Sequence, residues 1–268
     1  ARAKMVNARL ERHKKKIENG ELPISTGVYY TDPCIVEQLG TVGYDMMWID
    51  QEHTGFTLEI IRSHIQAAAA ADIFSMVRVV DLNPATVKPI LEMAPDGVIF
   101  PMINTVEAAQ QAIASCLYPP KGIRGFGPVR AHRFGAVPMD EYIRDAEKCL
   151  WRILQIEHVE GVKNLDKILE VPGIDSIVVG PNDLSASLGV LGQYRHPAVM
   201  EQMDKIAEIC NKHKVPFGVA LGYDEANISD WIRRGASWFA VGADMGYLDM
   251  GARQTLEQTR ALLNAKKG

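Results

Sequence analysis

Residues 155–189 read QIEHVEGVKNLDKILEVPGIDSIVVGPNDLSASLG, and they form one strand–helix–strand pattern. Apolar runs predict strands over residues 153–156 and 174–179, and the apolar spacing between them predicts a helix over residues 162–169. Parallel strands joined by a helix end on the same side of their sheet. Side chains that follow the two strands are therefore expected to lie close together.

A carboxylate follows each of these strands. Glu157 comes directly after the first strand, and Asp183 lies four residues beyond the second. Carboxylates are the ligands that hard divalent cations prefer, and two protein ligands leave positions open for water or a chelating substrate. The alternative is that both carboxylates only stabilise the helices that follow them. However, Glu157 ends an apolar strand, where an unpaired charge is costly.

Apolar runs of strand length alternate with helical patterns along the chain. Residues 6–19 predict a leading helix within the segment 1–20, and residues 248–265 predict a closing helix. The eight predicted strands cover residues 24–29, 45–50, 74–79, 97–100, 153–156 (within the segment 149–157), 174–179, 215–220 and 237–241. This α/β pattern predicts a single (β/α)8 TIM-barrel domain spanning residues 1–268. The alternative, a doubly wound open sheet, needs a Gly-rich turn after an early strand, which residues 25–27 match poorly.

Residues 118–138 are rich in glycine and proline and show little periodicity. The segment is too long for an ordinary connection between a strand and a helix. Long loops of this kind usually serve as lids, binding loops or interfaces. We therefore expect it near the active face or at a subunit interface.

Composition excludes several classes of protein. The net charge of −4 gives no reason to expect binding to nucleic acid or to an anionic membrane. No apolar run reaches the roughly 18 residues of a membrane span. The four cysteines fall in different predicted elements without metal-type spacing, which is typical of reduced thiols in a cytoplasmic protein.

A second group of polar residues follows the second predicted strand. In a TIM barrel the active face lies at the C-terminal ends of the strands. His53 comes three residues after Asp50, a spacing at which a turn can bring the two side chains together. A carboxylate–imidazole pair makes a general base. The alternative is an ordinary surface histidine in a loop.

Arg78 ends an otherwise apolar strand, so its guanidinium must meet an anion. Asp50, a metal-ligand carboxylate or a substrate oxyanion would serve, and a purely structural ion pair is the alternative. Pro181 and Asn182 lie where a helix starts, and backbone N–H groups there can receive a substrate carboxylate.

The predicted strand ends also exclude two kinds of site. They carry no lysine, so a Schiff-base mechanism is not expected. No Gly-rich pair suited to a phosphate follows the last two strands. Asp244 instead brings a negative charge there, which favours an unphosphorylated substrate.

Several motifs together carry a resemblance to a known family. They are WIDQEH at residues 48–53, VRV around Arg78, IFPMI at residues 99–103, KGIRGFG at residues 121–127, QIE at residues 155–157 and GPNDLSASLG at residues 180–189. Over residues 22–265 the chain resembles the metal-dependent pyruvate aldolases of the HpcH/HpaI family. That family includes enzymes acting on 2-keto-3-deoxy sugar acids and on 4-hydroxy-2-oxoheptanedioate.

The resemblance implies a carbon–carbon lyase that cleaves 4-hydroxy-2-oxo acids to pyruvate, or a pyruvate analogue, and an aldehyde. It implies Mg²⁺, Mn²⁺ or Co²⁺ on Glu157 and Asp183, with the reaction passing through a metal-stabilised enolate. Arg78 would stabilise the enolate oxygen, and His53, oriented by Asp50, would act as the base.

The resemblance also implies that Gln155 contacts the keto acid. It implies hexamers built from dimers that exchange their C-terminal helices. Gln51 and residues 54–55 depart from the DGEHAP that many members carry, and residues 128–134 also diverge. These positions border the aldehyde side of the site, so the aldehyde stays open.

Two further functions remain as alternatives. An oxaloacetate decarboxylase or a macrophomate-synthase-like enzyme would use the same enolate, formed by loss of CO₂. A binding barrel without turnover is the other alternative, but it predicts the loss of a metal ligand or the base. The chain retains all of these residues.

Overall fold

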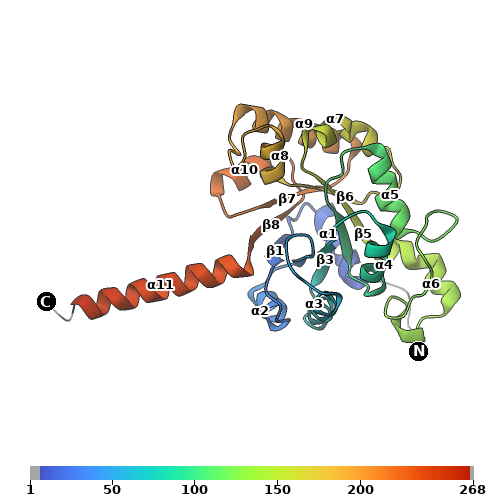
Figure 1. Ribbon diagram of the computed structural model, residues 1–268, viewed down its shortest axis with the longest axis horizontal. Helices are drawn as coiled ribbons and strands as arrows, with labels where there is room; N and C mark the ends of the chain where they lie inside the picture. The colour runs from blue at the N-terminus through green and yellow to red at the C-terminus, as the bar shows by residue number, and fades with distance from the viewer. Residues whose placement is uncertain (1–6, 266–268) are drawn as a thin grey trace.

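The computed structural model describes residues 7–265, and its eight strands form one closed parallel barrel in chain order (Figure 1). The strands are β1 (Ile24–Val28), β2 (Met46–Asp50), β3 (Phe74–Arg78), β4 (Gly97–Phe100), β5 (Trp151–Ile156), β6 (Ser176–Val179), β7 (Phe217–Leu221) and β8 (Trp238–Ala243). The predicted TIM barrel is confirmed, and the doubly wound sheet is excluded because β1 pairs with β8.

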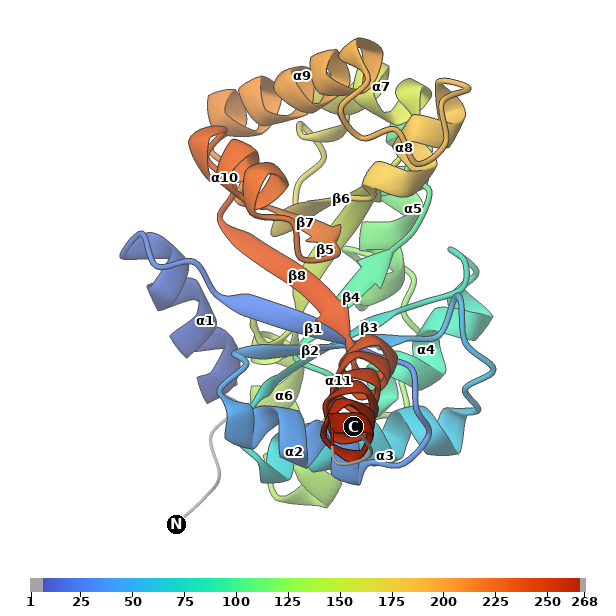
Figure 2. The same cartoon turned by 90° about the vertical axis from the view of Figure 1, so that its left-hand side faces the viewer.

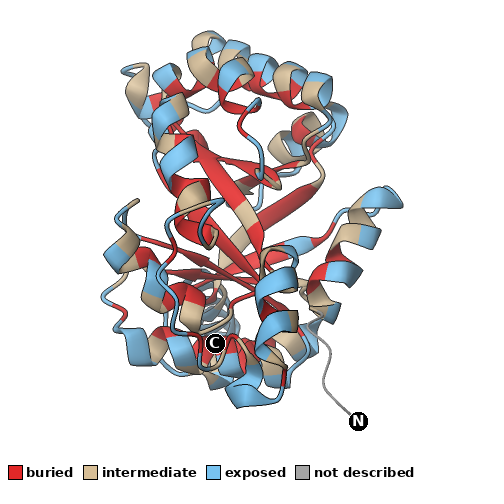
Figure 3. Ribbon diagram, turned by 90° about the vertical axis from the view of Figure 1, so that its right-hand side faces the viewer, coloured by how far each residue is buried: buried red, intermediate tan, exposed pale blue. Residues whose placement is uncertain are grey.

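The strands are buried on both faces, which explains their nearly continuous apolar sequences. Along β2, Met46 and Trp48 belong to the cluster that fills the barrel, whereas Ile49 belongs to the cluster between the strands and the helices. This alternation follows from the period of two along a strand. Figure 3 shows buried strands inside a ring of helices whose outward faces are exposed.

Helices connect the strands and surround the barrel (Figures 1 and 2). They are α1 (Ala8–Glu18), α2 (Cys34–Val42), α3 (Leu58–Ala70), α4 (Pro84–Glu92), α5 (Val106–Cys116), α6 (Met139–Asp145), α7 (Val159–Ile168), α8 (Pro181–Ser187), α9 (Pro197–His213), α10 (Glu225–Arg233) and α11 (Asp244–Ala265). Side-chain caps fix where three of these helices begin. Thr57, Asn83 and Thr105 each accept a hydrogen bond from a backbone N–H in the first turn of the helix that follows. No helix in residues 7–265 is long and apolar enough to cross a membrane.

The last helix begins earlier than its sequence predicts. It starts at Asp244 rather than at residue 248, and β8 extends to Ala243. The Asp244 carboxylate is buried and accepts hydrogen bonds from the backbone N–H groups of Tyr29 and Tyr30. It also accepts one from Met245 within its own first turn, so one side chain joins the end of β1 to the start of α11.

The leading helix α1 closes the N-terminal end of the barrel. Leu10 packs into the interior cluster. Arg9 forms an ion pair with Asp96 at 2.9 Å, and the Asn7 side chain donates to the same carboxylate at 2.8 Å. Since Asp96 directly precedes β4, these contacts fix α1 across the end opposite the predicted active face.

The segment of residues 118–138 lies at this same N-terminal end. Arg130 donates to the backbone carbonyls of Met93 and Ala94, which lie just before β4. The segment joins a helix to the next strand, and such connections return the chain to the N-terminal ends of the strands. Within its own chain the segment therefore lies at the end of the barrel opposite the predicted active face. Its place near an active face or at a subunit interface stays a prediction.

His13 of α1 is expected to make folding sensitive to acid. Its imidazole is 4% exposed, packs against Phe74 and Trp151, and has no hydrogen-bond partner on either nitrogen among the described residues. Burial lowers its pKa from 6.5 to about 4. The unfolded chain therefore binds a proton that the folded chain does not, and stability falls as the pH drops below 6.5. Between pH 7 and pH 5 this contribution is about 2 kcal/mol.

Urea unfolding of the wild type and His13→Leu at both pH values tests this expectation. The leucine variant should lose less stability at pH 5 than the wild type, by about 2 kcal/mol. Equal losses in the two proteins would show that His13 does not carry the acid sensitivity.

Candidate active site

A cavity of about 450 Å³ opens at the C-terminal ends of the strands. Its lining residues are Gly27, Tyr29, Trp48, His53, Arg78, Gln155, Gly180, Pro181, Asn182, Asp183, Ala220, Leu221, Gly222, Ala240, Gly242, Ala243, Met245 and Gly246. Of the residues predicted from the sequence, six line this cavity. Asp50 and Glu157 lie directly behind its wall and are almost fully buried. No lysine is found among the lining residues in the described part of the chain.

Glu157 is a buried carboxylate held in one orientation. One oxygen accepts a hydrogen bond from the backbone N–H of Met102 at 2.8 Å, and the other accepts one from the Gln155 amide. Burial, with added repulsion from Asp183 and Glu52, raises the pKa of Glu157 from 4.5 to about 6. The site therefore places a costly negative charge next to a cavity.

Gly180 makes the close approach of β6 to this carboxylate possible. A Cβ on Gly180 would lie 2.6 Å from Oε2 of Glu157 and 2.9 Å from its Cβ. Any larger residue would push the carboxylate away from its place, so the glycine at the start of the GPNDLS motif is a packing requirement.

The donor set fits a divalent cation that is only partly enclosed by protein. Glu157 and the exposed Asp183 would supply oxygen ligands from neighbouring strand ends, and a nearby cation would relieve their mutual repulsion. Within residues 7–265 no group of three or more His, Cys, Asp or Glu side chains is close enough to hold a metal. A cation on these two carboxylates would thus keep positions open for water and substrate.

Arg78 lies beside the cavity in a rigid ion-pair network. Its Nε donates to Asp50 at 2.9 Å, its Nη2 donates to the other oxygen of Asp50, and its Nη1 lies 3.0 Å from Glu52. The guanidinium also lies over the Trp48 ring at 5.2 Å. Arg78 has five N–H donors, and its hydrogen bonds to Asp50 use two of them, so the others remain for Glu52 and a substrate.

The prediction that Asp50 orients the His53 ring is wrong. The Asp50 carboxylate is occupied by Arg78, and it reaches His53 only through the backbone N–H at 3.5 Å. The His53 ring is 60% exposed, and its Nε2 lies 3.6 Å from Glu52. Register explains the difference, since Asp50 and Arg78 are paired residues on neighbouring strands. His53 keeps its place at the mouth of the cavity.

Gln155 is buried and presents an unused acceptor. Its Nε2 donates to Glu157, while its Oε1 has no partner among the described residues. A buried acceptor of this kind is costly unless a ligand or water donates to it. The free Oε1 atom still needs a hydrogen-bond donor, which agrees with the predicted contact between Gln155 and a substrate.

Pro181 and Asn182 both line the cavity, at the start of α8. Pro181 is buried, whereas Asn182 is exposed and accepts a hydrogen bond from the Tyr194 hydroxyl. The Asn182 side chain is therefore tied to the loop before α9.

Sequence reasoning missed three participants in the site. Glu52 lies between Arg78 and His53, and Tyr29 lines the cavity with its hydroxyl close to Asp50. The third is the backbone N–H of Met102, for which the side-chain sequence gives no signal. Asp244 adds no free charge to the cavity, because it is buried against backbone N–H groups.

The sequence profile described as HpcH/HpaI aldolase/citrate lyase matches residues 28–249. The chain belongs to this family. It is 35% identical over 227 residues to a 5-keto-4-deoxy-D-glucarate aldolase of Enterobacter sp. (strain 638), covering 84% of this chain and 88% of the relative. These relatives identify it as a carbon–carbon lyase, so the binding barrel without turnover is set aside.

Solved structures agree with the family assignment. A HpcH/HpaI aldolase/citrate lyase family protein from Burkholderia cenocepacia J2315 superposes with a TM-score of 0.87 at 31% identity, covering 95% of this chain and 100% of the other. Macrophomate synthase superposes with a TM-score of 0.84, covering 98% of this chain and 92% of the other. At 24% identity this second likeness shows the fold alone.

Proposed function

We propose that this lyase is a divalent-metal-dependent aldolase that cleaves 4-hydroxy-2-oxo acids to pyruvate, or a pyruvate analogue, and an aldehyde. The observation that carries the proposal is the buried Glu157 carboxylate, which lies directly behind the wall of the cavity that Asp183 and Arg78 line. The curated relatives named as aldolases of a keto-deoxy sugar acid support the same class of substrate.

Glu157 and Asp183 would hold the cation, for which Mg²⁺, Mn²⁺ and Co²⁺ are equally suited by oxygen ligation. When bound, the cation supplies Lewis acidity, which stabilises negative charge on the 2-oxo oxygen. Gln155 Oε1 offers an acceptor to a donor on the keto acid. The backbone at Pro181 and Asn182 borders the place where its carboxylate would lie.

The protein side chains account for the remaining steps. His53, at the solvent-facing mouth, would accept the proton of the C4 hydroxyl, through a water if the distance requires it. The C4 oxygen then forms the aldehyde carbonyl, and the electrons of the C3–C4 bond move into the enolate. The free N–H groups of Arg78 would stabilise the enolate oxygen. Protonation at C3 completes pyruvate, and the reverse sequence is aldol addition.

Pyruvate release from a panel of 4-hydroxy-2-oxo acids tests the proposal. Each substrate is incubated with chelator, with Mn²⁺ restored, and with the Glu157→Ala variant. Release that requires Mn²⁺ and disappears in the variant is the expected result. Release that survives chelation would contradict the metal mechanism. No release, with oxaloacetate still losing CO₂, would move the function to a decarboxylase.

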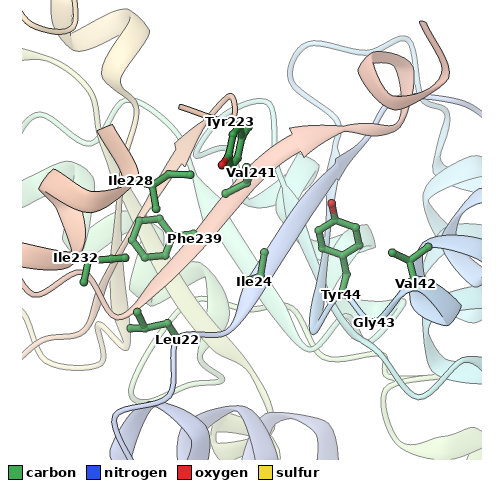
Figure 4. Close-up of a pocket in the computed structure, with 10 residues that line it drawn as sticks. All are labelled: Leu22, Ile24, Val42, Gly43, Tyr44, Tyr223, Ile228, Ile232, Phe239 and Val241. Carbon is green, nitrogen blue, oxygen red and sulfur yellow. The ribbon is translucent and has the colours of Figure 1, made fainter. Parts of the chain in front are cut away.

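We also propose that the protein assembles through exchange of its C-terminal helix, as dimers within a hexamer. Figure 1 shows α11 leaving the barrel, and Asp244 is the one buried residue of this fully described helix. An apolar groove lies where a helix would cover β8 and β1 (Figure 4). It is lined by Leu22, Ile24, Val42, Gly43, Tyr44, Tyr223, Ile228, Ile232, Phe239 and Val241. The α11 of a second copy would fill this groove with its own exposed leucines and methionines.

Ile232→Glu is expected to lower the molecular mass of the assembly, because subunits that exchange α11 would separate. Ile232 is 47% exposed in the groove, and a charge there would have to be buried beneath the partner helix. Light scattering after gel filtration measures the mass. Leu191→Glu, at a position 69% exposed and outside the groove, serves as the matched control. An unchanged mass in Ile232→Glu would contradict exchange through this groove.

A further inference from the structure

Tyr29 follows β1 at the edge of the cavity, and its backbone is fixed. Its N–H lies 2.9 and 3.1 Å from the two carboxylate oxygens of Asp244, and the N–H of Tyr30 lies 2.9 Å from one of them. Asp244 is 2% exposed, so these hydrogen bonds are shielded from water. The direction of the Tyr29 side chain is therefore set by the barrel and not by a mobile loop.

The Tyr29 hydroxyl lies close to the Asp50 carboxylate. This is the same carboxylate that receives Nε and Nη2 of Arg78, and it is fully buried. Burial and the Asp50 charge raise the pKa of Tyr29 to about 12, so the phenol keeps its proton and acts as the donor. A hydrogen bond from this phenol would restrain Asp50, and through Asp50 the Arg78 guanidinium that lines the cavity.

The Tyr29 ring lies on the side of the cavity away from Glu157. In an eight-stranded closed barrel β1 is opposite β5, the strand that Glu157 follows. The lining residues contributed by β1, β8 and the start of α11 are mostly small: Gly27, Ala240, Gly242, Ala243 and Gly246. A Cβ on Gly27 would lie only 2.8 Å from Cε2 of Tyr29, so the ring covers this glycine. Tyr29 and Met245 are the large side chains on this wall.

We propose that Tyr29 has two roles in the lyase reaction. Through its hydroxyl it is a positioning residue for the Asp50–Arg78 pair, and through its ring it limits the size of the aldehyde. This inference rests on the proposed function, since it assumes that the keto-acid part lies at Glu157 and Asp183. The aldehyde part then extends toward β1 and β8, where the ring of Tyr29 ends the available space.

Two assays of the Mg²⁺-loaded protein separate these roles. The first follows exchange of the pyruvate methyl protons with D₂O by NMR, without any aldehyde. The second measures kcat/KM for addition of pyruvate to acetaldehyde and to pentanal. The variants are Tyr29→Phe, Tyr29→Ala, Gly27→Ala and Gly27→Ala combined with Tyr29→Ala. Tyr30→Ala is the matched control, because Tyr30 is exposed and does not line the cavity.

Tyr29→Phe is expected to lower kcat for proton exchange about 10-fold with the KM for pyruvate nearly unchanged, since only a positioning hydrogen bond is lost. Its preference between the aldehydes should stay that of the wild type. Tyr29→Ala is expected to raise the pentanal-to-acetaldehyde ratio at least about 10-fold. Gly27→Ala should change the ratio more when the Tyr29 ring is present, because the nearest atom to the added Cβ belongs to that ring.

Three results would overturn the inference. They are an unchanged ratio in Tyr29→Ala, an equal effect of Gly27→Ala in both backgrounds, and unchanged proton exchange in Tyr29→Phe. If Tyr29→Ala does not fold, an unchanged ratio in Gly27→Ala overturns the inference by itself. A wild-type protein that exchanges no pyruvate protons would instead overturn the proposed function, and this inference with it.

Discussion

Glu157→Gln is expected to abolish metal-supported pyruvate release and, at the same time, to stabilise the metal-free protein. Glutamine keeps the size of the side chain but removes the negative charge that would bind the cation. We expect Mn²⁺ affinity to fall at least about 100-fold. Loss of a residue that only supports a metal ligand costs about 10- to 100-fold, and loss of a ligand itself should cost more. Titration of free Mn²⁺ by electron paramagnetic resonance measures this loss directly, independently of turnover.

The gain in stability follows from the raised pKa of Glu157. The folded protein holds this proton up to a pKa of about 6, whereas the unfolded chain releases it near 4.5. A raised pKa means that the contribution to stability is present below pH 4.5 and is lost as the pH rises through 6. At pH 8 the ionised carboxylate therefore costs the folded protein about 2 kcal/mol, a cost that glutamine removes.

Urea unfolding in chelator at pH 8 and pH 4 is the corresponding measurement. The variant should exceed the wild type in stability at pH 8 and equal it at pH 4. Glu160→Gln is the matched control, because Glu160 is exposed on the following helix and should change neither property. A Glu157→Gln protein that is less stable than the wild type at pH 8 would show that the ionised carboxylate stabilises the fold, and would contradict this prediction.

Arg78→Met is expected to damage both folding and activity. Arg78 is the partner of Asp50, whose side chain is fully buried. Removing one member of a buried ion pair leaves an uncompensated charge and costs about 3–5 kcal/mol. Loss of the donors that face the enolate oxygen should lower kcat by about 10²–10³. Urea unfolding and the pyruvate-release assay measure the two effects.

A second substitution separates the two effects of Arg78. In Arg78→Met with Asp50→Asn the fully buried Asp50 charge is removed together with its partner, so most of the stability should return while activity stays low. Arg62→Met, at an exposed position on α3, controls for loss of a positive charge. Recovery of activity together with stability in the double variant would show that Arg78 only supports the fold.

The barrel and the position of its chemistry were readable from the sequence. Buried parallel strands must be apolar over their whole length, and their regular alternation with helices predicts a closed barrel. The C-terminal ends of such strands share one face, so Arg78, Gln155 and Asp183 were found at the cavity as predicted. Boundaries were less accurate where contacts with another element decide them, as the hydrogen bonds from Tyr29 and Tyr30 to Asp244 do at the start of α11.

Partners within the site were decided only by the tertiary structure. Asp50 pairs with Arg78 and not with His53, because strand register sets those two side chains against each other. Tyr29 follows β1 and lies close to Asp50 at the end of β2, and no local sequence spacing predicts that approach. Periodicity along a chain fixes which residues reach a face of the barrel. Which of them touch depends on distances across the barrel, and these exist only once the strands have closed.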